Sequence, residues 1–337
     1  MNPIKTVLLL GGGEAFWLYL KHLRQLGDAK LIALTSERHL DEHIGDVGTL
    51  REALATTDVQ WVELAALNAA ALDQLAIDLS TTVAISMHAA WIIRQDVIDA
   101  LSGRVFNVHG TRLPQDRGGA GVSWQILRGN QYGVAVMHRV DVGIDTGDIV
   151  DFHEFLYDGC RTPVDYRRRY VDETMKLLER ITPRLLSGEE LGGLQQIPYL
   201  SSYWPRLNTE IHGWIDWSWS GTDILRFVRA FDDPYEGAHT LLGNRVVYLK
   251  DADFDTGDGA FHPFQAGLVY RVTGNYAAVC VTTGTLLIGR VFDQEHIQIP
   301  LTDLKPGQRL FTPIDKLEEA KRTRVQYNAS GLQVPGN

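Results

Sequence analysis

The stretch of sequence that decides the fold is residues 105–150, which read VFNVHGTRLPQDRGGAGVSWQILRGNQYGVAVMHRVDVGIDTGDIV. It opens with a short β-branched run, which favours a strand ending near His109. Asn107 and His109 stand at positions i and i+2, so in extended backbone both side chains point to one face. Open α/β sheets bind their ligands beyond the carboxyl ends of the strands. We therefore predict that Asn107 and His109 lie at a ligand-binding edge.

A carboxylate follows later in the same stretch. Residues 134–140 and 149–152 read as two more strands, and Asp145 lies between them in a turn flanked by Gly143 and Gly147. Such a turn can return the carboxylate to the edge that carries the amide and the imidazole. These three groups, without an activated Ser or Cys, suit transfer to an external nucleophile through a stabilised oxyanion. The alternative is that the histidine is only a satisfied residue at a strand end.

The sequence before residue 105 alternates strand and helix patterns. Helix patterns cover 15–26 and 69–79, and strand patterns cover 4–10, 31–35, 60–64, 82–87 and 104–108. The glycines at 11–13 predict a tight turn rather than a dinucleotide-binding loop, because Phe16 stands where the last glycine would be. This alternation predicts an α/β fold with a mostly parallel sheet that is covered on both faces.

The sequence after residue 150 changes character. Thr162 and Pro163 are typical of an N-cap and a first helical residue, and they open a long helix. Residues 198–205, PYLSSYWP, are aromatic and turn-rich and read as a linker. Beyond Thr240, after a helix pattern at 223–231, short strands alternate with turns. We predict a smaller second domain that is a β-rich barrel.

Composition excludes several classes of protein. The 337 residues are 45% hydrophobic, and the formal net charge is −10. Residues 1–199 hold 19 basic and 26 acidic side chains and residues 200–337 hold 13 and 16, so neither half is a basic nucleic-acid domain. No apolar run is long enough to cross a membrane, and no signal peptide is visible. With only two cysteines, the sequence fits a reducing cytoplasm.

The combination within residues 105–150 is far more specific than its parts. Asn-x-His, then a Leu-Pro-x-x-Arg-Gly loop, then Asp in a Gly-x-Asp-Thr-Gly turn resembles the N10-formyltetrahydrofolate-dependent formyltransferases. Residues 215–217, 224–230 and 234–238 look like the opening of that family's C-terminal barrel. The resemblance implies an α/β, Rossmann-like catalytic domain at 1–195, a linker at 196–210 and a smaller OB-like barrel domain at 211–330.

The resemblance also implies roles for individual residues. Asn107, His109 and Asp145 would be the catalytic trio. The cosubstrate N10-formyltetrahydrofolate would contact Met87, His88, Ala89, Leu113, Pro114 and Val142. The acceptor would contact Arg117, Gly118 and Trp124.

Several of these positions have structural alternatives. His88 and Arg117 are equally compatible with a structural role. His138, inside a strand pattern, is interpreted as a core residue. Arg112 stands where the family usually has an apolar residue, so the contacts of this loop are open. No metal is expected: the acidic run that starts at Asp251 imitates a calcium loop but lacks its closing glutamate, and it is interpreted as a solvated acidic loop.

Charge favours one class of acceptor over another. The branch of the family that formylates methionyl-tRNA carries a basic insertion after the second strand, whereas here residues 36–50, SERHLDEHIGDVGTL, are acidic. We therefore expect a nucleotide-linked amino sugar as the small-molecule partner, with no nucleic acid and no membrane. Methionyl-tRNA, a hydroxyornithine, hydrolysis of the donor and a non-catalytic binding module remain alternatives. The oligomeric state stays open, with a homodimer as one form.

Overall fold

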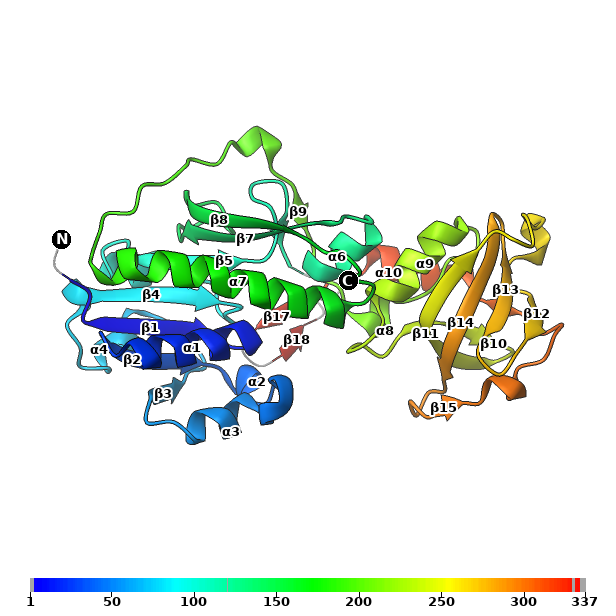
Figure 1. Ribbon diagram of the computed structural model, residues 1–337, viewed down its shortest axis with the longest axis horizontal. Helices are drawn as coiled ribbons and strands as arrows, with labels where there is room; N and C mark the ends of the chain where they lie inside the picture. Colours follow the sequence, from blue (N-terminus) through cyan, green and yellow to red (C-terminus); the bar gives the residue numbers. More distant parts are fainter. Residues whose placement is uncertain (1–2, 120, 329–330, 334–337) are drawn as a thin grey trace.

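The chain forms two bodies that lie side by side. The computed structural model describes residues 3–119, 121–328 and 331–333. Figure 1 shows an α/β body at the amino-terminal end and a β-barrel at the other, with short helices between them. This agrees with the predicted fold class, a Rossmann-like sheet followed by a smaller barrel.

The first body is built on a seven-stranded sheet in the order β3-β2-β1-β4-β5-β7-β8. The first five strands in that order run parallel, as predicted, and β7 and β8 are each antiparallel to their predecessor. The strands are β1 (Thr6–Gly11), β2 (Lys30–Thr35), β3 (Gln60–Glu63), β4 (Thr82–Met87), β5 (Val105–His109), β7 (Tyr132–Arg139) and β8 (Ile149–Leu156).

Helices cover both faces of this sheet because its central strands are apolar throughout. On β1, Val7 and Leu9 pack toward α1 (Glu14–Leu26) and α7 (Pro163–Leu186), as Figure 1 shows for the near face. Leu8 and Leu10 belong to the core on the opposite face, beneath α4 (Ala69–Asp73) and α5 (Gln95–Ala100). The side chains of one strand alternate between these two cores, which makes the sheet the middle layer of the body.

One predicted helix is much shorter than expected. The pattern at 69–79 predicts a single helix, but α4 ends at Asp73. Ala76 adopts a left-handed φ of 50°, which a continuing helix cannot accommodate, so this prediction was wrong beyond the first turn. The remaining short elements of the first body are α2 (Glu37–Leu40), η1 (Gly45–Val47), α3 (Leu50–Ala55), η2 (Leu79–Thr81), β6 (Arg117–Gly118) and α6 (Gly121–Leu127).

The second body is an antiparallel sheet that curls on itself, in the order β12-β13-β14-β11-β10-β16, with β15 paired to β14. Backbone hydrogen bonds from Val269 to Gln308 and from Leu310 to Gly267 bring the two edges together. The elements are β10 (Ala238–Leu242), β11 (Arg245–Asp255), η4 (Pro263–Gln265), β12 (Val269–Val272), β13 (Ala277–Val281), β14 (Gly284–Phe292), β15 (Gln298–Ile299), η5 (Leu301–Asp303) and β16 (Leu310–Phe311).

The acidic run at 251–255 lies in β11 rather than in a loop. Asp253 faces Leu287 across the ladder between β11 and β14, so regular pairing overrides the turn-like composition of the run. The expected solvated loop was therefore wrong in its structure. Among the described residues, no group of three or more His, Cys, Asp or Glu side chains is arranged to hold a metal ion.

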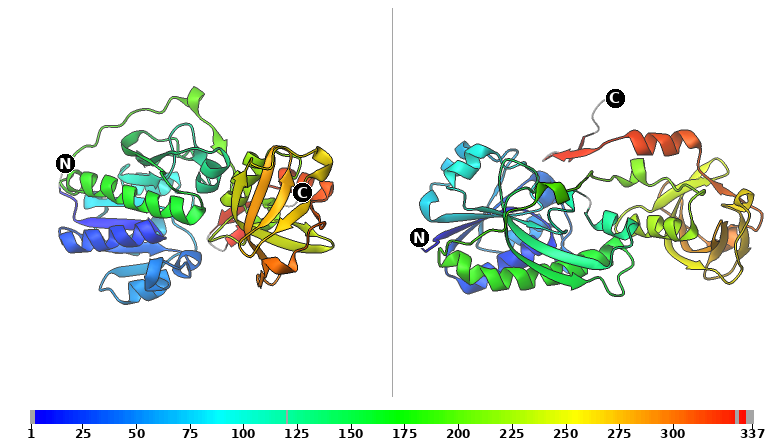
Figure 2. Two further views of the ribbon diagram at one scale, coloured as in Figure 1. Left: turned by 45° about the vertical axis from the view of Figure 1, so that its right-hand side comes forward. Right: turned by 90° about the horizontal axis from the view of Figure 1, so that it is seen from above.

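Several segments join the two bodies. They are η3 (Pro198–Leu200), β9 (Tyr203–Trp204), α8 (Thr209–His212) and α9 (Gly221–Ala230). The Ser123 hydroxyl on α6 donates to the carbonyl of Ala230 at the end of α9, which ties the bodies directly. After the barrel, α10 (Ile314–Arg322), β17 (Gln326–Asn328) and β18 (Gly331–Gln333) lead the chain back toward the first body, as the view from above in Figure 2 shows. No helix in the described ranges is both long and apolar enough to cross a bilayer.

Candidate active site

Asn107 and His109 share one face of β5 at the carboxyl edge of the sheet. Both side chains are partly exposed, while Phe106 and Val108 are buried in the core on the opposite face. The strand itself therefore holds the amide and the imidazole in a fixed relation to each other, on a rigid element rather than on a loop.

The turn after β7 returns Asp145 to this edge. Asp145 adopts a left-handed φ of 55°, and its Oδ2 accepts a hydrogen bond of 3.1 Å from the backbone N–H of Gly118. Gly147 closes the turn against β7, where a Cβ would lie 2.0 Å from the carbonyl oxygen of Arg139. Only glycine fits there, which explains why the carboxylate is flanked by this residue.

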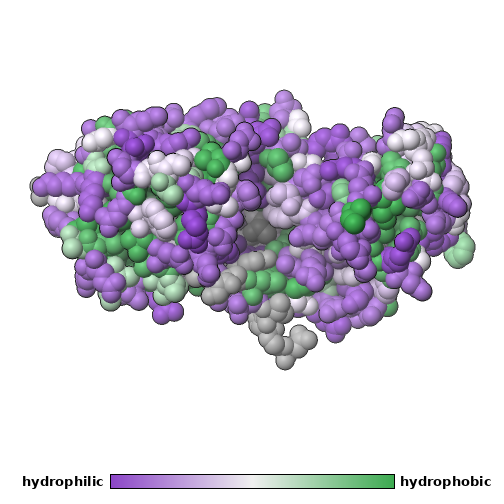
Figure 3. Space-filling view, turned by 90° about the horizontal axis from the view of Figure 1, so that it is seen from below, coloured by the Kyte–Doolittle hydropathy of each residue, from purple (hydrophilic) through white to green (hydrophobic). Residues whose placement is uncertain are grey.

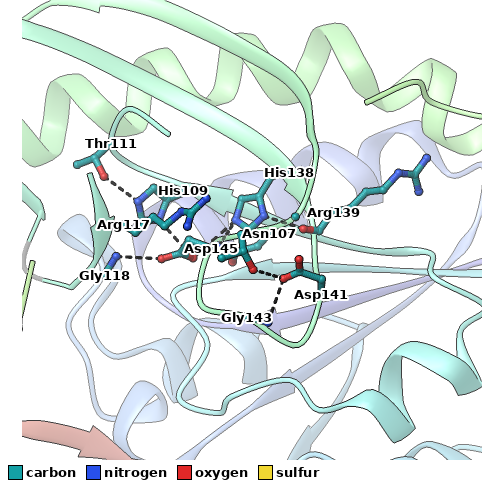
Figure 4. Close-up of polar contacts among 12 residues, drawn as sticks. Asn107, His109, Thr111, Arg117, Gly118, His138, Arg139, Asp141, Gly143 and Asp145 are labelled. Carbon is teal, nitrogen blue, oxygen red and sulfur yellow. Dashed lines mark hydrogen bonds and ion pairs between the residues drawn. The ribbon is translucent and has the colours of Figure 1, made fainter. Parts of the chain in front are cut away.

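The three groups converge in space. His109 Nδ1 lies 3.7 Å from Asp145 Oδ1, and Figure 4 shows the side chains of Asn107, His109 and Asp145 gathered between β5 and the turn. The Asp145 side chain is 15% exposed and that of His109 is 11% exposed. The cluster is thus shielded from bulk water yet reachable from outside.

His138 also belongs to this cluster, which the sequence interpretation missed. It faces Asn107 directly in the ladder between β5 and β7. Its Nε2 lies 3.1 Å from Asn107 Nδ2 and 3.7 Å from Asp145 Oδ1. The ring is buried, as expected of a core residue, but its contacts place it among the polar groups of the site rather than in the apolar core.

The partners of the two imidazoles fix where their protons lie. His138 Nδ1 is 2.7 Å from the carbonyl oxygen of Arg139 and His109 Nε2 is 2.9 Å from that of Asp116, and a carbonyl can only accept. Each of these nitrogens therefore carries a hydrogen. When neutral, His138 then accepts from Asn107 through Nε2. Neutral His109 presents an unprotonated Nδ1 toward Asp145.

A hydroxyl supports this orientation of His109. Thr111 Oγ1 donates to the carbonyl of Asp116 and also lies 2.7 Å from His109 Nε2. Thr111 is itself buried, so the loop holds this edge of the ring in place. Sequence reasoning did not single out Thr111 or Asp116, since both lie in an irregular loop.

The surroundings of His109 and Asp145 set the protonation states of these two groups. Burial disfavours the charged form of His109 and lowers its pKa, and the nearby Asp145 carboxylate only partly opposes this. Burial alone would raise the pKa of Asp145, but contact with His138 and the charge of His109 outweigh it and lower that pKa to about 2. At neutral pH the site therefore holds an ionised carboxylate beside a neutral imidazole.

The residues predicted to contact the folate are divided between surface and core. Met87 and Leu113 are buried, and Leu113 packs against Val134 and Val136. His88 follows directly with a left-handed φ of 57°, and its ring meets Tyr170 edge to face at 6.3 Å. The other predicted positions are Ala89, which is half-buried, Pro114, which is buried, and Val142, which is 70% exposed.

The residues predicted to contact the acceptor all have partners within the protein. The Arg117 guanidinium donates two hydrogen bonds to Gln196 Oε1, and the Gly118 N–H donates to Asp145. Trp124 Nε1 donates to the carbonyl of Pro205 at 2.8 Å. Their roles in acceptor binding stay predictions, while their observed role is to brace the site and its connection to the barrel.

Comparison with known proteins identifies the family. The formyl transferase model matches residues 20–182, and the model of the formyl transferase C-terminal domain matches residues 209–308. The chain belongs to the formyl transferase family. It is thus an enzyme that transfers formyl groups, and the first matched range contains every member of the trio.

Solved structures share the fold of this formyl transferase at low sequence identity. WlaRD, a sugar 3N-formyl transferase solved with dTDP and 5-N-formyl-THF, is 19% identical, with a TM-score of 0.63 over 86% of this chain and 97% of that one. An N-formyltransferase from Helicobacter canadensis, in complex with folinic acid and dTDP-3-aminofucose, is 16% identical, with a TM-score of 0.65 over 86% and 100%. Methionyl-tRNA formyltransferase from Clostridium thermocellum is also 16% identical, with a TM-score of 0.53 over 75% and 95%.

Proposed function

We propose that this formyl transferase moves the formyl group of N10-formyltetrahydrofolate to the amino group of a nucleotide-linked amino sugar. The observation that carries the proposal is the facing pair of acceptors in the site. His109 Nδ1 and Asp145 Oδ1 are 3.7 Å apart, and neither carries a hydrogen at neutral pH. An N–H donor placed between them would satisfy both, and a primary amine is such a donor.

The donor is a formylated folate. WlaRD and the Helicobacter canadensis enzyme, which share the fold, were solved with 5-N-formyl-THF and folinic acid, respectively. In this chain His88 and Ala89 follow β4 at the same sheet edge as the trio, where the end of each parallel strand faces the ligand side. These residues would hold the pterin beside β5.

The chemistry is a direct transfer. The amine nitrogen attacks the formyl carbon, a new C–N bond forms, and the bond from that carbon to folate N10 breaks. One amide hydrogen of Asn107 is directed to His138, which leaves the second for the developing oxyanion. His109 Nδ1 takes the proton released by the amine and passes it to N10, while the Asp145 charge stabilises the imidazolium.

Charge supports a small acceptor over a tRNA. Within the acidic segment 36–50, His39 packs against Gly12, just beyond the carboxyl end of β1, so this segment borders the sheet edge that carries the site. The Glu42 carboxylate also contacts His39 Nδ1 at 3.1 Å. A phosphate backbone approaching here would meet carboxylates rather than a basic insertion.

We propose that the acceptor approaches the site from where the two bodies meet. The space-filling view in Figure 3 shows, from below, a hollow between the α/β body and the barrel that is bordered largely by hydrophilic side chains. We place the reaction in the cytoplasm, where folate donors and nucleotide sugars would both be available to it.

The test is turnover of N10-formyltetrahydrofolate with and without a panel of amino-sugar nucleotides. We expect donor consumption to require one of them and to yield its formamide. Substitution of Asn107, His109 or Asp145 by Ala should lower kcat by about 10²-fold or more, the scale of losing an oxyanion donor or an acid–base group. Steady release of formate without an acceptor would instead indicate a hydrolase. Wild-type rates in any two of the three variants would refute the trio.

A further inference from the structure

The residue of interest is Gln196, which lies outside the trio at the start of the connection to the barrel. It is only 5% exposed, although its neighbours Gln195 and Ile197 are both exposed. A buried amide in an otherwise exposed segment must have its hydrogen-bonding groups satisfied by the protein.

All four hydrogen-bonding positions of this amide are used, and two of them bond to the backbone of the turn that carries Asp145. Gln196 Nε2 donates to the carbonyl oxygens of Asp145 at 2.9 Å and of Gly147 at 2.7 Å. Gln196 Oε1 accepts from Nε and a terminal nitrogen of Arg117, at 3.2 and 2.7 Å. The side chain thus clamps the backbone of the turn on one side and the loop after His109 on the other.

The segment that follows holds the same loop through its backbone. The N–H groups of Arg117 and Gly119 donate to the carbonyls of Ser202 and Trp204, both at 3.1 Å. Trp204 Nε1 donates to the Asp116 carboxylate at 3.1 Å. Because the Asp116 carbonyl accepts from His109, this segment supports the imidazole as Gln196 supports the carboxylate.

We infer that Gln196 is a positioning residue for Asp145, and that through it the connecting segment 196–204 sets the catalytic geometry of the first body. The inference rests on the catalytic role of Asp145 proposed above. The left-handed backbone of Asp145 persists only where its surroundings over-determine it, and the two bonds from Gln196 are part of that constraint.

The chemistry of the position requires an amide. Only an amide can donate twice and accept twice at one planar group. A carboxylate of the same shape would keep the contact with Arg117, but it would direct an oxygen at the carbonyls of Asp145 and Gly147. Gln196→Glu is therefore a nearly isosteric substitution that replaces only the donor Nε2 with an oxygen that accepts.

The experiment compares Gln196→Ala and Gln196→Glu with the matched control Gln195→Ala, whose side chain is exposed. We expect both variants at 196 to lower kcat by about 10²-fold, the scale of a displacement of about 1 Å, with KM for the folate donor unchanged within roughly twofold. The control should keep the wild-type kcat within about twofold. Thermal melting checks that each variant is folded.

A second readout needs neither donor nor acceptor. In protein carrying ¹⁵N-labelled histidine, the His109 ring is assigned by its loss in His109→Asn and titrated by NMR. Burial lowers the pKa of His109 and the Asp145 charge partly opposes this in the wild type, so displacing that carboxylate in Gln196→Ala should lower this pKa further.

The outcomes separate this inference from the proposed function. A folded Gln196→Ala enzyme with wild-type kcat, beside a slow Asp145→Asn enzyme, overturns the positioning role alone. Wild-type kcat in Asp145→Asn overturns the proposed role of the carboxylate. A loss of kcat without a change in the pKa of His109, or an equal loss in Gln195→Ala, also overturns the inference.

Discussion

At the scale of single residues, the site depends on which nitrogen of His109 carries the proton. The carbonyl of Asp116 holds that proton at Nε2, so the nitrogen that faces Asp145 is a base when the ring is neutral. The same ring becomes a hydrogen-bond donor toward the reacting atoms only after it has taken a proton. One histidine can therefore act first as base and then as acid within one turnover.

This assignment gives a pH dependence with a definite sign. Asp145 stays ionised down to about pH 2, so it does not limit activity in the ordinary range. The pKa of His109 is lowered, so its neutral form prevails above a pKa that lies below the usual value of about 6.5.

We expect kcat/KM to rise from acid pH to a plateau at mildly alkaline pH, with the upper part of the rise set by the substrate amine. His109→Asn should keep only the amine's part, which titration of the free sugar nucleotide measures independently. A wild-type profile that is flat from about pH 5.5 to 8.5 would contradict proton removal from the amine.

At the scale of elements, the turn after β1 contacts the end of β4, next to the candidate site. Gly11 pairs with Met87 across the parallel ladder and has a φ of 119°. The next N–H, that of Gly12, donates to the Met87 carbonyl at 3.1 Å. This turn thus fixes the end of β4, immediately before His88.

Substitution of Gly11 tests how tightly the two strand ends are joined. A Cβ on Gly11 would lie 2.0 Å from the Met87 carbonyl oxygen, so Gly11→Ala must move one of two paired strands as well as adopt a positive φ. We expect a loss of about 2–5 kcal/mol in the free energy of unfolding, measured by denaturant titration. The control is Gly27→Ala, at φ 69° with no atom within 4 Å of the added Cβ, which should cost only about 1 kcal/mol. Equal losses in the two variants would show that backbone conformation, not the close contact, decides the stability.

Helices and strands with a strong hydrophobic or capping pattern could be predicted from sequence, but the register between paired strands could not. The capped helix that begins at Pro163 and the buried strand β1 follow from local chemistry alone. His138 was interpreted as core because its strand pattern says nothing about direction. Only the antiparallel register of β7 beside β5 sets it opposite Asn107.

At the scale of the whole molecule, the site depends on chain segments far apart in sequence. Asn107, His109 and Asp145 could be predicted to lie together because they fall in one stretch with one strand and one turn. Gln196 could not, because it lies in an irregular connection with no periodicity. Its contact with the backbone of Asp145 forms only when the folded chain brings this connection beside the turn. The residues 198–205 that read as a linker contain β9, which pairs with β6 beside the site.

Net charge is the property of the whole molecule that bears on the acceptor. The chain carries a formal charge of −10, and the acidic segment 36–50 borders the carboxyl edge of the sheet, where we propose that the ligands bind. A tRNA acceptor binds largely through its phosphates, and each Lys or Arg that neutralises a phosphate releases counterions condensed on the nucleic acid. We therefore expect charged initiator tRNA to bind no more tightly than about 10⁻⁶ M even at low salt, the level of non-specific association.

A gel-shift titration measures this affinity for tRNA, with the Clostridium thermocellum methionyl-tRNA formyltransferase as the positive control. Because counterion release makes binding to phosphates depend steeply on salt, the titration is repeated at increasing salt. Sub-micromolar, salt-sensitive binding, or efficient formylation of methionyl-tRNA by this chain, would replace the amino sugar with tRNA as the acceptor.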